Sequence, residues 1–415
     1  MSGALSCSNL PASSALTVWH SWGGAELATL KQLLKRYRKI HPDVEVLALQ
    51  IPHDRLLDKF IRSSAANGGP DLLIGDNDWS GKLAQSGLLA TIFDETTAAL
   101  SKGPTDATIA AEVVTRDPQA ALFPIADEQL FAPETLAALR VDQKIYAWPE
   151  SLETVALYYN RQIIAKPPAT VPDMLRLTAQ THVPEGSALV FNTAFYFSAG
   201  YFLGGGGTIF QPGGNSTVNT PAGQQMLAWL ARLKSSPGVL ATNDYGKADS
   251  LYKQGKAGMI VNGPWALADY QQALGPNMGV APLPRLADGR PARPWIGVKT
   301  LMVNANADAV HRRLAVDFCR FVTEPAIQLA LSAGCGHIPA VQGIELPADS
   351  PLRAFQHQAR TGIPKGADPL LAVIWEPLDR AIQEVINGGK EPAVALARAE
   401  AAISAKIAAV RANLQ

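Results

Sequence analysis

Acidic side chains stand at two predicted turns, where they are placed to bind or to cleave a polyhydroxylated molecule. Asp76, Asn77 and Asp78 follow a short apolar run, at the carboxyl end of a predicted strand, where open α/β sheets bind ligands. Glu150 and Glu153 flank a predicted turn between two strands. Two carboxylates about 5–9 Å apart can hydrolyse a glycoside, and carboxylates also accept hydrogen bonds from sugar hydroxyls. An ordinary Asx turn at the first cluster and a solvated glutamate at the second are the alternatives.

Tryptophan is the second residue type that points to a sugar. The flat apolar face of a sugar ring stacks on tryptophan, and several tryptophans stand next to predicted turns. Trp229 instead falls in the apolar stripe of a predicted helix, so we expect it in the core. Few arginines and lysines accompany the acidic cluster, whereas a phosphate would need them or a helix N-terminus. The pattern favours a neutral ligand. The tryptophans next to turns are Trp22, Trp79, Trp265, Trp295 and Trp375.

The sequence lacks the motifs of several other chemistries. It has no GxSxG nucleophile motif and neither the GxxxxGK[ST] nor the GxGxxG phosphate-binding motif. The glycines at 204–207 have no lysine or hydroxyl residue at phosphate-loop spacing, and we interpret them as a place where backbone passes closely. The seven histidines show no i,i+4 or His-x-His pairing, so we expect neither a metal site nor a cofactor.

The composition is that of a globular chain with balanced charge. Of the 415 residues, 47% are hydrophobic, which supplies a sizeable core. The 36 basic and 36 acidic residues cancel, so bulk charge indicates no binding of nucleic acid or of an anionic membrane. No apolar run approaches the about 20 residues of a membrane span. Cys319 lies in a helical apolar pattern and is expected to be a buried thiol, with pairing to Cys335 as the alternative.

The first 15 residues are small and polar, and we expect a disordered N-terminal tail. They lack the charged and apolar regions of an intact signal peptide. Residues 4–7, Ala-Leu-Ser-Cys, loosely resemble a lipoprotein cleavage box, in which Cys7 becomes the acylated first residue. An incidental cysteine in a tail is the alternative.

Strands and helices alternate from residue 16 onward. Residues 16–19 are β-branched and aromatic and predict a strand, and apolar residues at helical spacing from 27 to 40 predict a helix. A strand at 44–51, a helix at 54–66 and a strand at 71–75 follow, which predicts a parallel sheet with right-handed crossovers. Further strands are expected at 144–149, 154–159 and 257–261, and helices at 224–234, 314–331 with a break at Pro325, 370–386 and 394–410.

Several segments, in collinear order, are similar to the solute-binding proteins of carbohydrate ABC importers, extracellular solute-binding protein family 1, of which maltose-binding protein is typical. Residues 70–90 resemble the family's first-lobe signature, and residues 144–160 resemble its hinge strand. Residues 256–265, Lys-Ala-Gly-Met-Ile-Val-Asn-Gly-Pro-Trp, are the most specific match. Trp375 and Asp379, one helical turn apart, resemble the late ligand helix. The resemblance covers nearly the whole chain from residue 16.

The resemblance implies an α/β, two-lobed periplasmic-binding-protein fold of type II. The ligand cleft would lie between lobes joined by three hinge crossings. The N-terminal lobe would hold residues 16–152 plus 298–350, and the C-terminal lobe residues 153–297 plus 351–415. In the family, open lobes bind the ligand, hinge closure buries it, and the closed form docks on the permease.

The resemblance also implies which residues bind the ligand. Asp78 and Glu153 match carboxylates that bond sugar hydroxyls, Trp265 and Trp375 match stacking positions, and Phe197 falls near a stacking tyrosine. The first strand–helix turn also touches ligand in the family. The ligand-binding residues expected on these grounds are Ser21, Trp22, Gly23, Asn77, Asp78, Trp79, Glu153, Phe197, Trp265, Trp295, Trp375 and Asp379.

Four positions depart from the family pattern. Gly75 stands where the family has a stacking tryptophan, and Trp79 stands where it has an arginine. Phe195 replaces a second-lobe carboxylate, and Asp379 replaces an arginine of maltose-binding protein. The departures imply a remodelled pocket.

The sequence therefore predicts a binding protein rather than an enzyme, with no cofactor, no nucleic-acid partner and a monomeric state. It would capture a neutral sugar or small glycoside, such as trehalose, sucrose, maltose or glucosylglycerol, and deliver it to an ABC permease. Its place would be the periplasm or, lipid-anchored, the outer face of the cytoplasmic membrane. The alternatives are a glycerophosphate or phosphodiester binder of the same fold, a glycosidase using Glu150 and Glu153, and a sensor that signals to a membrane receptor.

Overall fold

The computed structural model describes residues 14–94, 122–123, 125–141, 143–211 and 214–412. Most of the predicted N-terminal tail, Cys7 included, lies outside these residues. The last two residues of that tail, Ser14 and Ala15, already belong to the first strand, because they pair with Val44 and Glu45 of the next one. Within the described residues, no helix is both long enough and apolar enough to span a membrane.

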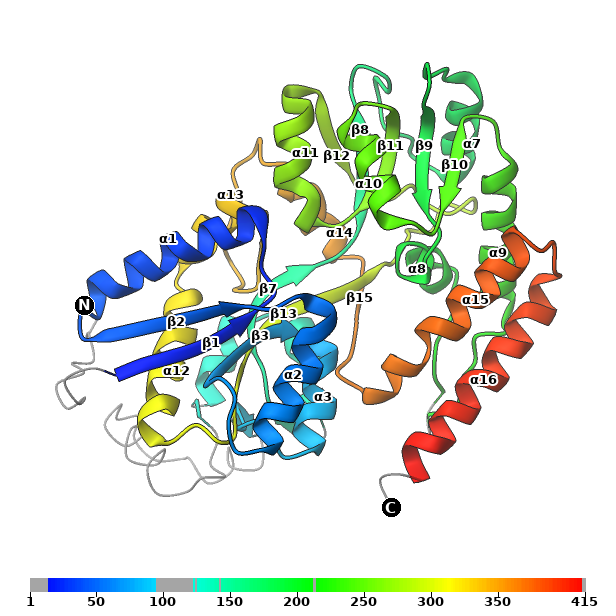
Figure 1. Cartoon of the computed structure of the whole chain (residues 1–415). Coiled ribbons are helices and arrows are strands. Elements are labelled where there is room, and N and C mark those ends of the chain that lie inside the picture. The colour runs from blue at the N-terminus through cyan, green and yellow to red at the C-terminus, as the bar shows by residue number, and fades with distance from the viewer. Residues whose placement is uncertain (1–13, 95–121, 124, 142, 212–213, 413–415) are drawn as a thin grey trace.

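The fold is mixed α/β and has two lobes, each built on its own sheet (Figure 1). In the first lobe, β1, β2 and β3 run parallel, and β13 runs antiparallel to β3 and to β7. The order of this sheet is β14 (Ile338–Pro339), β7 (Trp148–Glu153), β13 (Trp295–Val303), β3 (Leu72–Asp76), β1 (Ser14–His20) and β2 (Val44–Gln50), with β15 (Ile363–Pro364) paired to β13.

Helices pack against this sheet around one apolar core. The predicted stripe of the first helix is confirmed, since Leu30, Leu33 and Tyr37 are buried. Cys319 and Cys335 are buried free thiols, so the predicted burial is confirmed and the alternative of a disulfide is wrong. The helices are α1 (Gly24–Ile40), α2 (His53–Ala65), α3 (Asn77–Gln85), α6 (Pro133–Ala137), α12 (Ala309–Val322) and α13 (Pro325–Cys335), with η1 (Ile125–Leu130) and a small sheet of β4 (Phe93–Asp94), β6 (Lys144–Ile145) and β5 (Arg140–Val141).

The second lobe is built on a five-stranded sheet with its own apolar core. Its order is β10 (Val239–Thr242), β9 (Ser187–Asn192), β11 (Ala257–Asn262), β8 (Ala156–Asn160) and β12 (Met278–Ala281). The helices are α7 (Val171–Gln180), α8 (Phe195–Gly204), α9 (Pro221–Ser235), α10 (Tyr245–Lys253), α11 (Leu267–Leu274), α14 (Leu352–Ala359), α15 (Trp375–Ile386) and α16 (Pro392–Ala412), with η2 (Pro264–Ala266), η3 (Gly275–Asn277) and η4 (Pro369–Val373).

Three predictions from the sequence concern this lobe. The close backbone passage expected at the glycine cluster is confirmed, because a Cβ on Gly204 would lie 2.5 Å from the carbonyl oxygen of Pro291. Trp229, expected in the core, is half-buried and packs against Tyr201 at the edge of this core. The single helix expected at 370–386 is instead η4 followed by α15, with Ile374 between them.

The predicted turn at residues 150–153 is wrong. These residues form the second part of β7, because Leu152 pairs with Val298 of β13 on one side and with Ile338 of β14 on the other. The register of β7 against β13 shifts between Ser151 and Pro149, which leaves Glu150 as the extra residue of a β-bulge.

The chain changes lobes between β7 and β8, between β12 and β13, and between β14 and α14. The exact boundaries given from the sequence stay a prediction.

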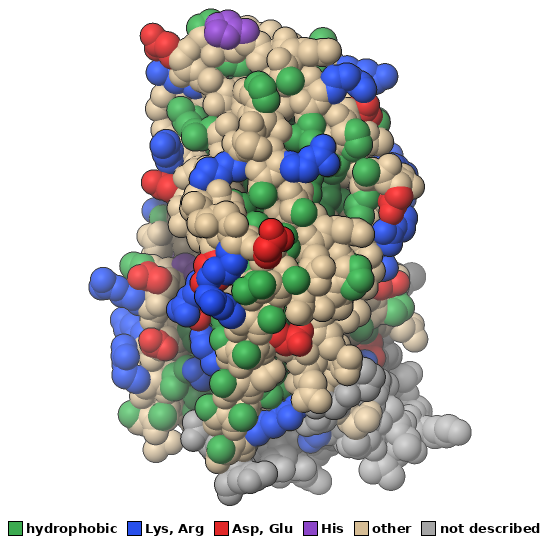
Figure 2. All heavy atoms as spheres, turned by 90° about the vertical axis from the view of Figure 1, so that its right-hand side faces the viewer, with side chains coloured by type: hydrophobic (Ala, Val, Ile, Leu, Met, Phe, Trp, Pro, Cys, Tyr) green, Lys and Arg blue, Asp and Glu red, His purple; other side chains and the backbone are tan. Residues whose placement is uncertain are grey.

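On the face turned to the viewer in Figure 2, basic and acidic side chains are interspersed among the described residues, without a continuous patch of one sign.

Candidate functional site

The first group of predicted ligand residues lies where β3 meets α3. Asp76 ends the strand, and Asn77, Asp78 and Trp79 form the first turn of the helix. The Trp79 ring packs directly on Gly75, since a Cβ on that glycine would lie 2.6 Å from the ring. The two departures from the family pattern therefore form one unit, in which the glycine makes room for the tryptophan.

A buried lysine balances the carboxylates at the ends of β3 and β7. The Lys299 Nζ lies 2.5 Å from Asp76 Oδ1 and 3.6 Å from Glu153 Oε1, and His53 Nε2 contacts the other Asp76 oxygen at 2.8 Å. Burial opposes ionisation of Asp76, but Lys299, the hydrogen bond from His53 and Lys365 together outweigh it and hold the pKa of that carboxyl low. Burial also opposes the charge of Lys299, and the two carboxylates nevertheless raise its pKa. For Glu153, burial dominates and raises the pKa.

Asp78 has one engaged and one free carboxylate oxygen. Its Oδ2 lies 3.3 Å from the Nζ of Lys365, whereas its Oδ1 is buried and has no hydrogen-bond partner among the described residues. A buried acceptor without a donor is unfavourable by about 1–3 kcal/mol. A ligand hydroxyl that donates to Oδ1 would remove this cost.

Asn77 is not available to a ligand. Its side chain is 1% exposed, and all its polar atoms bind the backbone. The amide nitrogen donates to the carbonyls of Ala138 and Lys365 at 3.1 and 2.5 Å, and the oxygen accepts from the N–H of Val298 at 3.1 Å. Asn77 thus links α3 to three backbone segments by hydrogen bonds.

The first strand–helix turn holds Ser21, Trp22 and Gly23, all predicted to touch ligand. Ser21 and Gly23 are half-buried beside the start of α1. The Trp22 ring is 4% exposed and packs edge-on against His337, with 5.0 Å between the ring centres. The structure does not bring this ring together with the other predicted aromatic residues, because it belongs to the core of the first lobe.

Glu150 is separated from Glu153 by its surroundings. It is fully buried, and its oxygens contact Ser151 Oγ at 2.7 Å and His337 Nδ1 at 2.8 Å. A substrate therefore has no access to Glu150, which the glycosidase alternative needs as one of its two carboxylates. Among the described residues, no three His, Cys, Asp or Glu side chains form a metal-binding group.

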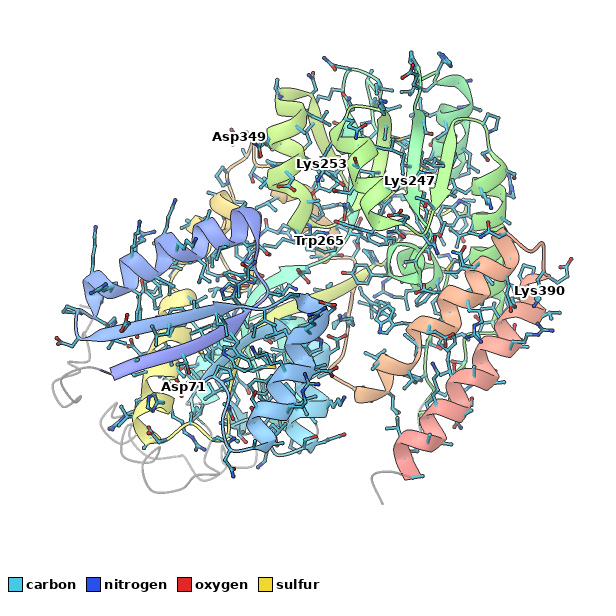
Figure 3. All side chains as sticks on the ribbon, viewed as in Figure 1. Asp71, Lys247, Lys253, Trp265, Asp349 and Lys390 are labelled. Atoms are coloured by element: carbon cyan, nitrogen blue, oxygen red, sulfur yellow. The ribbon has the colours of Figure 1, made fainter. Side chains whose placement is uncertain are left out.

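Aromatic side chains of the second lobe form a wall, here called the aromatic wall (Tyr196, Trp265, Trp295 and Trp375). The centre of the Tyr196 ring lies 6.2 Å from that of Trp265 and 6.3 Å from that of Trp375. Trp295 packs edge-on against Trp375 at 5.2 Å. Figure 3 places Trp265 at the edge of the second lobe that faces the first. Tyr196, Trp265 and Trp375 are half-buried and can stack on a sugar ring, whereas Trp295 is 5% exposed and supports the wall.

Trp265 is held in place by Tyr245, which Phe197 supports in turn. Its Nε1–H donates to the hydroxyl of Tyr245 at 3.0 Å, and the Tyr245 ring stacks on Phe197. Phe197 is 7% exposed, so it supports the wall rather than presenting a free face. The ring of Trp265 packs on Gly263, where a Cβ would lie 2.0 Å from it.

Asp379 and Trp375 share a pocket of about 490 Å³ on α15. One oxygen of Asp379 accepts from the backbone N–H of Phe195 at 2.6 Å, and burial raises the pKa of the carboxyl. The pocket is lined by Ala194, Asn243, Trp375, Glu376, Asp379, Arg380 and Gln383.

One residue of the aromatic wall, Tyr196, lies near the carboxylate cluster of the first lobe. Burial, and then the nearby carboxylate of Glu153, raise the pKa of the Tyr196 hydroxyl, to which Asp76 and Asp78 also contribute. Tyr196 therefore lies within electrostatic reach of the first-lobe cluster. Stacking rings on one side and hydrogen-bond acceptors on the other suit a ligand with apolar ring faces and hydroxyl edges.

Sequence reasoning missed Lys299, Lys365, His53 and Tyr196. The expectation that few basic residues accompany the acidic cluster is wrong, because Lys299 contacts Asp76. Lys299 lies 223 residues further along the chain, so the local sequence gives no sign of this contact. Both lysines are paired with carboxylates, so neither is a free cation for a phosphate. Only the structure distinguishes Tyr196, as the one residue of α8 that is not buried.

We expect Trp375→Ala to weaken ligand binding by about 1–3 kcal/mol, because it removes stacking surface from a half-buried ring. Isothermal titration calorimetry with a bound sugar measures the loss. The control is Trp229→Phe, since Trp229 packs against Tyr201 and its buried Nε1 has no hydrogen-bond partner among the described residues. Unchanged affinity in Trp375→Ala would exclude that ring from the site.

Comparisons with known proteins agree with this geometry. The family model described as bacterial extracellular solute-binding protein matches residues 32–383. The maltotriose-binding protein of Pyrococcus abyssi is 27% identical over 394 residues, covering 91% of this chain and 79% of that protein. The galactooligosaccharide-binding protein of Bacillus subtilis is 25% identical over 390 residues, covering 89% and 84%. The structure of the Thermus thermophilus maltotriose-binding protein with maltotriose superposes with a TM-score of 0.78 at 24% identity, covering 94% of this chain and 100% of that one.

Proposed function

The chain belongs to the family of bacterial extracellular solute-binding proteins, and on that premise we propose that it binds a neutral sugar or small glycoside between its lobes and delivers it to an ABC permease. The observation that supports this most is the free, buried Oδ1 of Asp78 in the carboxylate cluster, near Tyr196 of the aromatic wall. No bond needs to break, in keeping with a family of binding proteins rather than enzymes.

The ligand class follows from the charge of the site. Lys299 and Lys365 are neutralised by Asp76, Glu153 and Asp78, which leaves acceptors for hydroxyl donors. The named relatives bind maltotriose and galactooligosaccharides. We infer a small neutral glycoside, with trehalose, sucrose, maltose, maltotriose and glucosylglycerol as the candidates.

The proposed cycle uses the two-lobed fold. The ligand binds one lobe, the lobes close about the three crossings, and the closed form docks on the permease. The lobes are assigned as residues 16–152 plus 298–350 and residues 153–297 plus 351–415. The protein would act as a monomer outside the cytoplasmic membrane, in the periplasm or anchored by a lipid on Cys7, which lies outside the described residues.

A thermal-shift screen tests the proposal. A ligand at about 100 times its dissociation constant stabilises a protein by about 2.7 kcal/mol, which moves the Tm of a chain this long by a few degrees. The panel holds the five candidate glycosides, galactooligosaccharides, free monosaccharides, polyols and glycerol phosphates. We expect a shift with at least one neutral glycoside and with no phosphate.

A shift with glycerol phosphate alone would contradict the proposal and favour the phosphate-binding alternative. Should nothing shift the Tm, the denatured protein is analysed by mass spectrometry for a small molecule that purified with it. A released glycoside supports the proposal, and a preparation free of any small molecule that still ignores the whole panel contradicts it.

A further inference from the structure

The β15 segment, residues 362–368, makes a contact between the lobes that the three crossings do not include. It follows α14, which packs against β8 and β12 of the second lobe, and it precedes α15, which packs against α9 and α16. Between these helices, β15 pairs with the start of β13, with Ile363 opposite Trp295 and Pro364 opposite Ile296. Trp295 and Ile296 fall on the second-lobe side of the expected boundary, so the segment reaches the first lobe through its contact with α6 and through Lys365.

Each polar group of Lys365, namely its backbone N–H, its backbone carbonyl and its Nζ, contacts a residue outside this segment. Its N–H donates to the carbonyl of Ile296 at 2.8 Å, and its own carbonyl accepts from the Asn77 side chain at 2.5 Å. Its Nζ lies 3.3 Å from Asp78 Oδ2. The approach is close, because a Cβ on Gly362 would lie 2.7 Å from the Pro294 carbonyl oxygen. The segment is thus bound to β13 and to the first turn of α3 at once.

The ion pair decides which oxygen of Asp78 is left for a ligand. The Lys365 side chain is 11% exposed and that of Asp78 is 19% exposed, so both charges are largely removed from water. Charges in such surroundings keep their geometry because separating them leaves each one uncompensated. With Oδ2 held by the lysine, Oδ1 is the oxygen without a described partner.

We propose that Lys365 is a positioning residue for the ligand, which holds Asp78 so that its Oδ1 accepts from a ligand hydroxyl and which joins this ligand-binding turn of the first lobe to the second lobe. The inference rests on the proposed function, since it takes Asp78 as a ligand acceptor. A change in the position of Asp78 is passed directly to the segment that leads into α15, where Trp375 and Asp379 stand.

The test is isothermal titration calorimetry on the full chain, with maltotriose as probe, or the panel glycoside with the largest Tm shift. Lys365→Met keeps the apolar stem and removes the charge, and its affinity is expected to fall at least about tenfold. Lys365→Arg restores a cation and is expected to stay within about threefold of wild type. The control, Lys390→Met, breaks the pair with Glu384 at the outer edge of the same lobe and is expected to leave affinity unchanged (Figure 3).

A double-mutant cycle separates positioning from general damage. In an Asp78→Asn background, Lys365→Met is expected to change affinity less than about twofold, since its effect passes through Asp78. An equal loss in both backgrounds, or wild-type affinity in Lys365→Met, would overturn the inference. If Lys365→Met does not fold, the double variant is used, because it leaves no buried carboxylate without its cation. Its affinity is then compared with that of Asp78→Asn. A wild-type protein that binds no glycoside at all overturns the proposed function, and this inference falls with it.

Discussion

Lys299→Met is expected to destabilise the protein by about 3–5 kcal/mol, because it leaves buried carboxylates without their cation. Lys299 Nζ lies between Asp76 and Glu153, with its side chain 15% exposed. Methionine has a similar length and no charge, so the packing of the stem is kept. The loss should appear as a lower midpoint in urea unfolding followed by tryptophan fluorescence.

The chain offers a matched control for this substitution. Lys253 also bridges two carboxylates, with Nζ 2.6 Å from Asp249 and 3.6 Å from Asp269, but its side chain is 34% exposed (Figure 3). Water screens such a pair, so Lys253→Met is expected to cost less than about 1 kcal/mol. Equal losses in the two variants would mean that burial of Lys299 contributes nothing to the stability of its ion pairs.

The parts of the site that lie close together in sequence could be predicted. Asp78 and Trp79 share one helical turn directly after a strand, and strand–helix turns are where α/β sheets bind ligands. Trp375 and Asp379, which the resemblance to the family supplied, lie one turn apart on α15, and the structure places both in one pocket. Periodicity and turn chemistry are local signals, so they reach residues whose neighbours in space are also neighbours in the chain.

The parts that depend on long-range pairing could not be predicted. The turn expected at 150–153 is a strand because its partners, β13 and β14, lie far along the chain. For the same reason Trp22 looked like a turn residue facing a ligand, although His337 and the first-lobe core cover its ring. Lys299 and Lys365 carry no local signal at all. Their role exists because the topology brings β13 and β15 beside the end of β3.

His337→Gln is expected to destabilise the protein by about 3 kcal/mol or more, with a loss that depends on pH. The His337 ring is 6% exposed, and its nitrogens contact Glu150 at 2.8 Å and Glu26 at 3.1 Å, while Cys335 also lies close. With a carboxylate at each nitrogen, a charged ring can donate to both. Burial opposes that charge, but Glu150 and Cys335 together outweigh it and raise the pKa of His337 well above 6.5.

The sign of the pH dependence follows from the two shifted groups. A raised histidine pKa gives stability that is fully present below the unfolded value of 6.5 and is lost as pH rises through the folded value. Burial would raise the pKa of Glu26, but the hydrogen bond from His337 lowers it, so this contribution is present above 4.5 and lost in more acidic solution. The difference in unfolding free energy between wild type and His337→Gln should therefore be largest between about pH 4.5 and 6.5.

Urea unfolding of both proteins at several pH values from 4 to 9 measures this difference, with His182→Gln as the control, because His182 is exposed. A surface substitution of this kind changes stability by no more than about 0.5 kcal/mol. A difference between wild type and His337→Gln that stays constant across the range would mean that His337 is neutral in the folded protein. One of its two carboxylate neighbours would then hold the proton. A difference in unfolding free energy that decreases above pH 6.5 would show that His337 is charged in the folded protein. The Glu26–His337–Glu150 group then links α1, β7 and the end of α13 by charged hydrogen bonds.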